Sequence, residues 1–255
     1  MAVKTTDTTV TTTVTTTTAV LLAAGAGTRL GRGPKALLTF RGRPLVEHQI
    51  AMLLAGGCRD VLVVLGAGSE RVLAEADLTG ARPVLNPDWQ SGMASSHRAG
   101  IAAALELPAD TVLVALVDQP GLNADVTARL RAAWQPGRIL AAGYREERDG
   151  SPGSNGGGVL RRGHPVLFDA RLAARSIGMD VDGRPGITRP DGARLHGTHP
   201  DGARQERRAA SARPSPDAGA RSFLSDNGHL LDIVDCSGLA DGRDVDTEAD
   251  LVLLD

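Results

Sequence analysis

A glycine-rich segment near the amino terminus carries the residue types that a triphosphate site requires. It spans Gly25 to Lys35 and reads GAGTRLGRGPK. Gly25 and Gly27 allow backbone N–H groups to approach phosphate oxygens, while Arg29 and Lys35 supply positive charge. The glycine spacing alone is a weak signal, because it lies one residue away from the dinucleotide fingerprint GxGxxG. Together with the arginine and the lysine, it predicts a loop that binds a nucleoside triphosphate.

Asp118 is the second candidate for chemistry. It follows the apolar run TVLVALV at 111–117, the strongest strand prediction in the chain. A carboxylate at the carboxyl end of a strand can hold Mg²⁺ against nucleotide phosphates. Aspartate also favours the start of a turn, and QPG follows it here, so a purely structural role is the alternative.

Alternating strands and helices are expected to position the loop and Asp118. Short apolar runs indicate strands, and apolar residues at helical spacing between glycine or proline stops indicate helices. The expected strands are 19–23, 60–65, 83–85 and 111–117, and the expected helices are 44–55, 70–76, 95–105 and 123–134. This order predicts an α/β fold with a Rossmann-like, doubly wound, mostly parallel sheet that binds ligands beyond the carboxyl ends of its strands.

The rest of the chain predicts one domain, at 19–255, with two irregular segments. Residues 1–18 are nearly all threonine after position 4, and we expect a disordered tail without the apolar run of a secretory signal. Residues 177–219 are rich in Gly, Arg, Pro and Asp and lack an apolar period, which predicts a disordered insertion. Between and after these segments we expect strands at 165–168 and 230–234, and helices beginning near Asp169 and Thr247.

The composition excludes several classes of protein. The chain has 255 residues, a formal charge of −2 and only 2% aromatic residues, so nucleic acid is an unexpected partner. No stretch reaches the roughly 18 apolar residues of a membrane-spanning helix. Cys58 and Cys236 form neither a zinc pattern nor a disulfide framework, which favours a reducing cytoplasm.

Several motifs together resemble the molybdenum cofactor nucleotidyltransferase family, within the wider class of NTP transferases. LAAGAGTRLGRGPKALL is similar to the signature loop of that family. The later stretches GMASSHRAG, LVDQPGL, GHPVLF and DVDTEADL are similar to its other motifs, and the likeness covers 19–176 and 217–255. Members have a sheet like that of the nucleotide-diphospho-sugar transferases. They move a nucleotidyl group from an NTP to a phosphate-bearing acceptor and release pyrophosphate.

The resemblance implies a role for each residue that matches a motif. Arg29 would hold the β- and γ-phosphates, and Lys35 would neutralise the α-phosphate in the transition state. Asp246 would be a second magnesium ligand beside Asp118, although it or Thr247 could instead cap the last helix. The residues that would contact the base, the sugar or the phosphates through the backbone or at a helix start are Leu22, Ala23, Ala24, Gly25, Gly27, Gly92 and Ser95.

Two histidines depart from the pattern or add little to it. His97 stands where the family usually has an aliphatic residue, so it either contacts the acceptor or lies solvated on a helix surface. His164 is interpreted as a structural turn residue rather than a general base, because an attacking phosphate is already ionised.

The leading hypothesis is therefore a magnesium-dependent enzyme that transfers CMP from CTP to a molybdopterin-type cofactor. The resemblance also implies a molybdoenzyme or its chaperone as a partner. The LAAG opening favours CTP over GTP, whose relatives tend to show LAGG, and GTP stays open. An NAD(P)-dependent oxidoreductase is the alternative from another class, but residues 65–68 offer neither an acid nor an arginine to bind the ribose. A non-catalytic nucleotide-binding module is the third.

Overall fold

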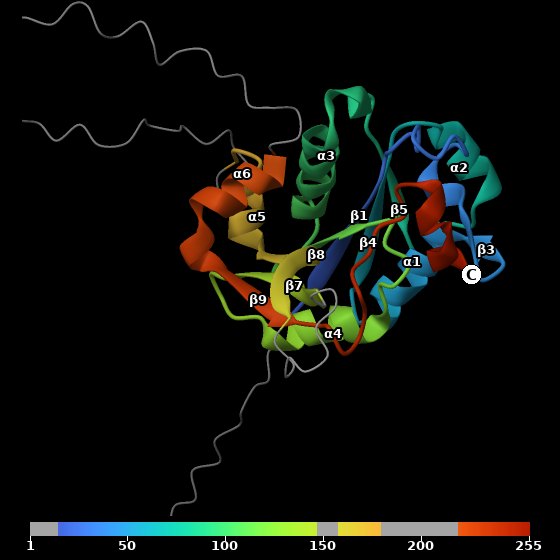
Figure 1. The fold of residues 1–255 in the computed structure, drawn as a ribbon. Helices are drawn as coiled ribbons and strands as arrows, with labels where there is room; N and C mark the ends of the chain where they lie inside the picture. Colours follow the sequence, from blue (N-terminus) through green and yellow to red (C-terminus); the bar gives the residue numbers. More distant parts are fainter. Residues whose placement is uncertain (1–14, 147–157, 180–218) are drawn as a thin grey trace, which may run out of the picture.

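A seven-stranded sheet forms the centre of the molecule (Figure 1). The computed structural model describes residues 15–146, 158–179 and 219–255. The strands lie in the order β5-β4-β1-β6-β8-β7-β9. Only β8 runs antiparallel to its neighbours, so the sheet is mostly parallel, as expected. The bounds are β1 Thr17–Ala23, β4 Asp60–Leu65, β5 Arg82–Leu85, β6 Thr111–Leu116, β7 Ile139–Glu146, β8 Val159–Asp169 and β9 Leu231–Asp235.

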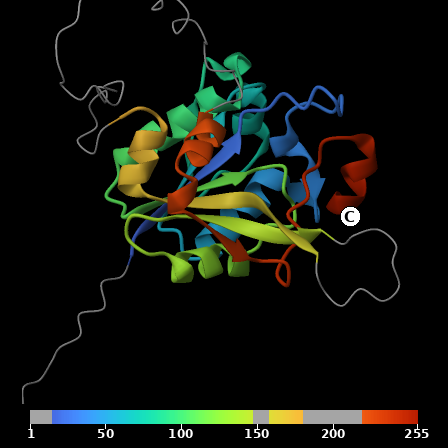
Figure 2. The same ribbon diagram turned by 60° about the vertical axis from the view of Figure 1, so that its left-hand side comes forward.

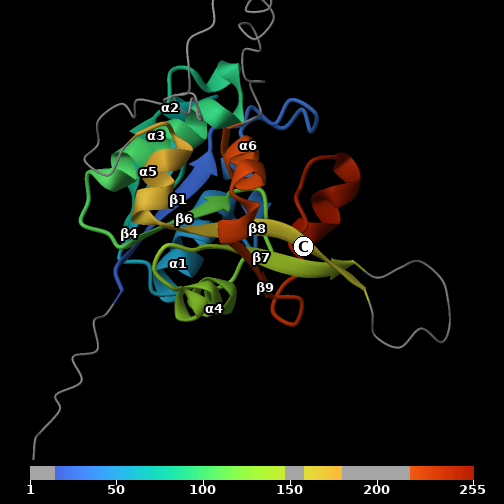
Figure 3. The same cartoon turned by 90° about the vertical axis from the view of Figure 1, so that its left-hand side faces the viewer.

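Helices cover both faces of this sheet (Figures 2 and 3). The bounds are α1 Leu45–Ala55, α2 Ser69–Glu75, α3 Met93–Leu105, α4 Ala124–Ala133, α5 Ala170–Ser176 and α6 Gly219–Asp226. α1 and α4 pack on one face, and α3, α5 and α6 pack on the other. Successive side chains of a strand point to opposite faces, so β1 places Leu21 in one buried cluster and Val20 in the other. The strands are apolar on both sides for this reason, and the predicted doubly wound fold is confirmed.

Short elements complete the fold. β2 Thr39–Phe40 pairs with β3 Arg43–Pro44. The 3-10 helices are η1 Lys35–Leu37, η2 Trp89–Ser91, η3 Gly228–Leu230 and η4 Glu248–Leu254. The last of these stands where an α-helix is expected, and Thr247 caps it with a capping box that includes Asp250. None of the described helices is long and apolar enough to cross a membrane.

The structure corrects the expected boundary of the threonine tail. β1 begins at Thr17, so Thr17 and Thr18 are strand residues rather than tail, and both side chains are buried. The Thr17 and Thr111 hydroxyls share a hydrogen bond of 2.8 Å between the two strands. β-Branched threonine suits a half-buried pleated strand, and tertiary pairing decides which threonines join it. Residues 1–14 lie outside the described part of the chain.

The structure also differs from the expectation after residue 138. β7 is not expected from the sequence, and β8 begins six residues before the predicted strand at 165. The expected insertion is shorter at both ends, because Ile177 and Gly178 form a turn after α5 and Gly219 already begins α6. The expected insertion otherwise falls at 180–218, outside the described residues.

Candidate active site

The glycine-rich loop and Asp118 meet at one edge of the sheet, where two neighbouring parallel strands end. Leu22 of β1 pairs with Leu116 of β6, so the residues that follow each strand emerge side by side. Gly27 has φ +61°, and a Cβ there would lie 2.3 Å from the carbonyl oxygen of Gly33. The loop folds back on itself at this point, and a larger residue would open it.

Lys35 joins two carboxylates that come from distant parts of the chain. Its Nζ donates to Asp118 Oδ2 at 2.7 Å and to Asp246 Oδ1 at 2.5 Å. Asp246 lies on the segment after β9, and the Val245 N–H holds that segment in place by donating to the Asp118 carbonyl at 2.8 Å. The Lys35 side chain is only 14% exposed. Three of the four residues expected at the catalytic and metal positions are thus brought together, while the fourth, Arg29, is exposed in the loop.

The charge state of Lys35 follows from these contacts. Burial alone would lower its pKa, but hydrogen bonds and attraction from Asp118 and Asp246 outweigh burial and raise the pKa. A raised lysine pKa keeps the group protonated, and the associated stability is lost only as the pH rises through the folded-state pKa. Lys35 is therefore an ammonium group at neutral pH.

Two buried glutamines fix the turn that carries Asp118. Gln49 of α1 donates through Nε2 to the Gln119 carbonyl at 2.7 Å. Gln119 donates through its own Nε2 to Asp244 Oδ1 at 2.7 Å and to the Gly242 carbonyl at 3.1 Å. Both faces of the turn are thereby anchored. Neither glutamine carries a sequence signal beyond the position of Gln119 next to Asp118.

The carboxylates suit a divalent cation that is shared with phosphates. Burial raises the pKa of Asp244, and the negative charges of Asp118 and Asp246 raise it further, so three carboxyl groups crowd together. The part of the chain that the structure describes holds no group of three or more His, Cys, Asp or Glu placed to bind a metal. Mg²⁺ is commonly held by one or two carboxylates with waters and substrate phosphates. Asp118 and Asp246 fit that requirement.

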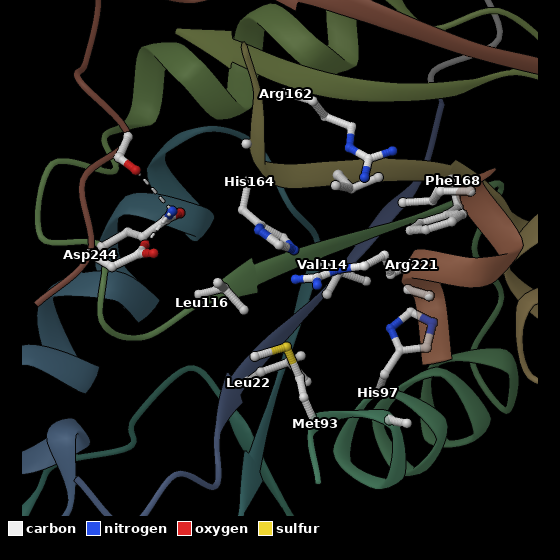
Figure 4. A pocket seen from close by; sticks show the side chains of 17 residues that line it. Leu22, Met93, His97, Val114, Leu116, Arg162, His164, Phe168, Arg221 and Asp244 are labelled. Atoms are coloured by element: carbon white, nitrogen blue, oxygen red, sulfur yellow. Dashed lines mark hydrogen bonds between the residues drawn. The ribbon is translucent and has the colours of Figure 1, made fainter. Parts of the chain in front are cut away.

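A cavity of about 400 Å³ opens beside these residues, between α3, β8 and α6 (Figure 4). Leu22, Val114 and Phe168 form part of its apolar wall. The polar side chains that reach it are His97, His164, Gln119, Asp244, Arg162 and Arg221. From the sequence, His97 is one of two alternatives, an acceptor contact or a solvated surface residue, and His164 is expected only to shape a turn. The structure instead places His164 within β8, where it lines the cavity. Nothing in the local pattern around Arg162 or Arg221 points to a site.

The remaining predicted residues lie around the same edge. Leu22, Ala23 and Ala24 are buried at the end of β1, while Gly25 and Arg29 are exposed in the loop. Gly92, with φ +103°, directly precedes α3. The Ser95 hydroxyl lies 3.0 Å from the Asp88 carbonyl and accepts from Asn86 Nδ2 at 2.9 Å, so it ties the loop before α3 to the helix.

His97 is buried rather than solvated on the helix surface, since its side chain is packed against α5 and β8. The residue is 3% exposed, and its ring lies 6.0 Å from the Phe168 ring between centroids. Burial lowers its pKa to about 4, and the positive charges that His164 and Arg98 place nearby act in the same direction. His97 is therefore a neutral imidazole at neutral pH.

We expect the free energy of unfolding to fall on acidification from pH 6.5 to pH 4, in part because of His97. The unfolded chain binds a proton on this histidine near pH 6.5, whereas the folded chain resists protonation until about pH 4, so the unfolded state binds more protons in this window. The cost at pH 4 is on the order of 3 kcal/mol. Denaturant unfolding at several pH values should show a flatter profile for His97→Leu than for the wild type. Identical slopes would contradict a buried neutral imidazole.

A family model described as the MobA-like NTP transferase domain matches residues 19–229. Nicotine blue oxidoreductase from Paenarthrobacter nicotinovorans is 45% identical over 227 residues, which are 89% of this chain and 90% of that protein. The bifunctional protein GlmU from Azorhizobium caulinodans is 38% identical over 129 residues, which are 49% of this chain but only 28% of that protein.

Solved structures show the same fold. The crystal structure of Rv0371c from Mycobacterium tuberculosis H37Rv has a TM-score of 0.64 at 24% identity, covering 95% of this chain and 98% of that one. A complex of the same protein with manganese has a TM-score of 0.58 at 22% identity, covering 94% and 98%.

Proposed function

The chain belongs to the MobA-like NTP transferase family of nucleotidyltransferases, and we propose that it transfers CMP from CTP to a molybdopterin-type cofactor and releases pyrophosphate. The observation that carries this proposal is the Lys35 ammonium held between Asp118 and Asp246, beside the glycine-rich loop. That arrangement offers cationic and carboxylate groups at the place where a triphosphate would lie.

In the proposed reaction, a phosphate oxygen of the acceptor attacks the α-phosphorus of the nucleotide. A new P–O bond forms there, the bond from the α-phosphorus to the bridging oxygen breaks, and its electron pair leaves with pyrophosphate. The attacking oxygen is already ionised and needs no strong base. Lys35 would stabilise the negative charge that grows on the α-phosphate, and Arg29 would bind the β- and γ-phosphates.

Asp118 and Asp246 would hold a divalent cation, with Mg²⁺ as the expected ion. When bound, the ion would neutralise phosphate charge and orient the triphosphate. The family membership and the crowding of carboxylates at this edge support the use of a divalent cation.

A second candidate, an oxidoreductase, is suggested by the name of the relative from Paenarthrobacter nicotinovorans, which is 45% identical. Against a nicotinamide cofactor stands the segment after β4. From the last residue of β4 onward it reads Leu65, Gly66, Ala67 and Gly68, and it contains neither an acid to bind a ribose hydroxyl nor an arginine to bind a 2′-phosphate. The two candidates predict different products and can be separated directly.

The test measures pyrophosphate release from the purified full chain with Mg²⁺, molybdopterin cofactor and each of the four NTPs in turn. Release that depends on CTP and on the acceptor would support the proposal, while release with another NTP would keep the reaction and change the base. A parallel assay follows NADH and NADPH oxidation with a quinone-type dye as electron acceptor. Dye-dependent oxidation without pyrophosphate release under any condition would overturn the transferase proposal in favour of the second candidate.

A further inference from the structure

The cavity beside the carboxylates has an apolar wall and a cationic region. Its volume of about 400 Å³ is in the range of small-molecule sites. Apolar side chains from one face of β1, β6 and β8 and from α6 line it: Leu22, Val114, Leu116, Val166, Phe168 and Leu224. A flat, largely apolar ring system is the kind of molecule that such a wall would desolvate.

Positive charge enters the cavity from two separate elements. Arg162 lies on β8 and Arg221 on α6, and the imidazole of His164 lies between Asp244 and Arg221 (Figure 4). Burial lowers the pKa of His164 to about 4, and the charges of Arg162 and Arg221 act in the same direction. Asp244 is the acidic residue among those that line the cavity, and its Oδ1 already accepts a hydrogen bond from Gln119. An anionic group near the two guanidinium groups would therefore gain charge-assisted hydrogen bonds.

The tautomer of His97 can be worked out from its neighbours. The Ser176 hydroxyl donates its proton to the Ala173 carbonyl at 2.7 Å, so its oxygen can only accept from His97 Nε2, which lies 3.1 Å away. The proton of the neutral ring is thus on Nε2, and Nδ1 carries a lone pair. Within the described residues no hydrogen bond reaches Nδ1, while the residue itself lines the cavity.

We propose that this cavity is the acceptor subsite and that it selects an anionic heteroaromatic molecule. Arg162 and Arg221 would bind the anionic group, and His97 Nδ1 would accept a hydrogen bond from an N–H or O–H on the ring system. The inference rests on the proposed function in that it calls the cavity's ligand the acceptor. It goes beyond that function by assigning recognition to three side chains and by requiring a hydrogen-bond donor on the ligand at His97.

The specificity follows from the cost of an unpaired buried acceptor. A ligand of the same shape and charge that lacks the donor would cover Nδ1 and leave this acceptor without a hydrogen-bond partner. Sites built to hydrogen-bond a substrate group discriminate strongly against analogues that lack it. We expect at least about a tenfold preference in the dissociation constant for the ligand with the donor.

The experiment compares two bicyclic carboxylates by isothermal titration of the full chain. Pterin-6-carboxylate has ring N–H donors, and 2-naphthoate does not. We expect the wild type to prefer the pterin, His97→Leu to lose the preference, and His97→Gln, which keeps an acceptor, to retain part of it. Arg162→Gln and Arg221→Gln should weaken both ligands by about tenfold or more. Arg171→Gln, an exposed arginine on α5, is the matched control and should change neither.

Several outcomes would overturn the inference. Equal affinity of the wild type for both ligands would refute the role of His97 in recognition. Unchanged binding in both arginine variants would refute the anion site. Nitrogen-15 NMR of the wild type gives a check that needs no variant, because a protonated Nδ1 in the free protein would refute the assigned tautomer.

This failure is distinct from failure of the proposed function. Suppose that the enzyme transfers a nucleotide to molybdopterin but binds the two probe ligands with equal affinity. The proposed function would then be supported and the proposed subsite refuted. A His97-dependent preference in a protein that transfers no nucleotide would support the subsite for an anionic heteroaromatic ligand and refute the transferase proposal.

Discussion

Lys35→Met is expected to lower the turnover number for nucleotidyl transfer by about 10²–10³-fold. In the proposed reaction the ammonium group would lie beside the α-phosphate, where negative charge develops, so its loss should raise the barrier more than it weakens binding of the NTP. Steady-state kinetics of pyrophosphate release would measure the turnover number, and titration with CTP would measure affinity separately. Lys35→Arg keeps the positive charge in a different shape and should recover only part of the rate.

The control for Lys35 is an ion pair at the opposite edge of the sheet. Arg138 lies just before β7 and contacts Asp232 at 2.5 Å, away from the loop and the carboxylates. Arg138→Gln should leave the turnover number near that of the wild type. If Lys35→Met weakened CTP binding alone and left turnover intact, the protein would behave as a nucleotide-binding module, and the catalytic role would be refuted.

Asp118→Asn is expected to have the second large effect, a fall in the turnover number of about 10²–10³-fold together with a higher Mg²⁺ requirement. The amide keeps the size of the side chain and removes the negative charge that would hold the ion. It also removes one of the two charges that raise the pKa of Lys35. Rates measured across a Mg²⁺ titration separate the two consequences. The part of the lost rate that saturating Mg²⁺ restores reflects weaker binding of the ion, and the part that it does not restore reflects the change at Lys35.

Asp241→Asn is the matched control for this variant. Asp241 lies on the segment that leads to Asp246, but its side chain is exposed and contacts Arg243 at 2.6 Å. This control should leave both the rate and the Mg²⁺ dependence unchanged. An Asp118→Asn enzyme with wild-type Mg²⁺ dependence would show that Asp118 serves only the turn before QPG.

The parallel half of the fold could be predicted from the sequence because its signals are local. Each of β1, β4 and β6 is a short run of apolar residues buried on both faces, and Asn123 caps α4 through a hydrogen bond from Val126 N–H at 3.1 Å. β7 could not be predicted from the sequence because ILAAGYRE mixes small and polar residues, and its strand conformation depends on pairing with β8 and β9. α6 escapes because it follows a segment of biased composition.

The candidate site divides in the same way. Lys35 and Asp118 could be proposed because the residue types and their places after strands are visible in the chain. Gln49, Gln119 and Asp244 could not, since their roles arise from contacts between residues 70 to 125 positions apart. The burial of His97 was equally hidden, because it depends on α5 and β8 packing over α3 rather than on the sequence around the histidine.

The placement of the cavity has a consequence for laboratory evolution. The glycine-rich loop and Asp118 follow β1 and β6, whereas His97, Arg162 and Arg221 reach the cavity from α3, β8 and α6. Mutations at 97, 162 and 221 can therefore alter the shape and polarity of the cavity without touching the Lys35 contacts. A focused library at those three positions would explore new specificities while each clone keeps an intact reaction centre.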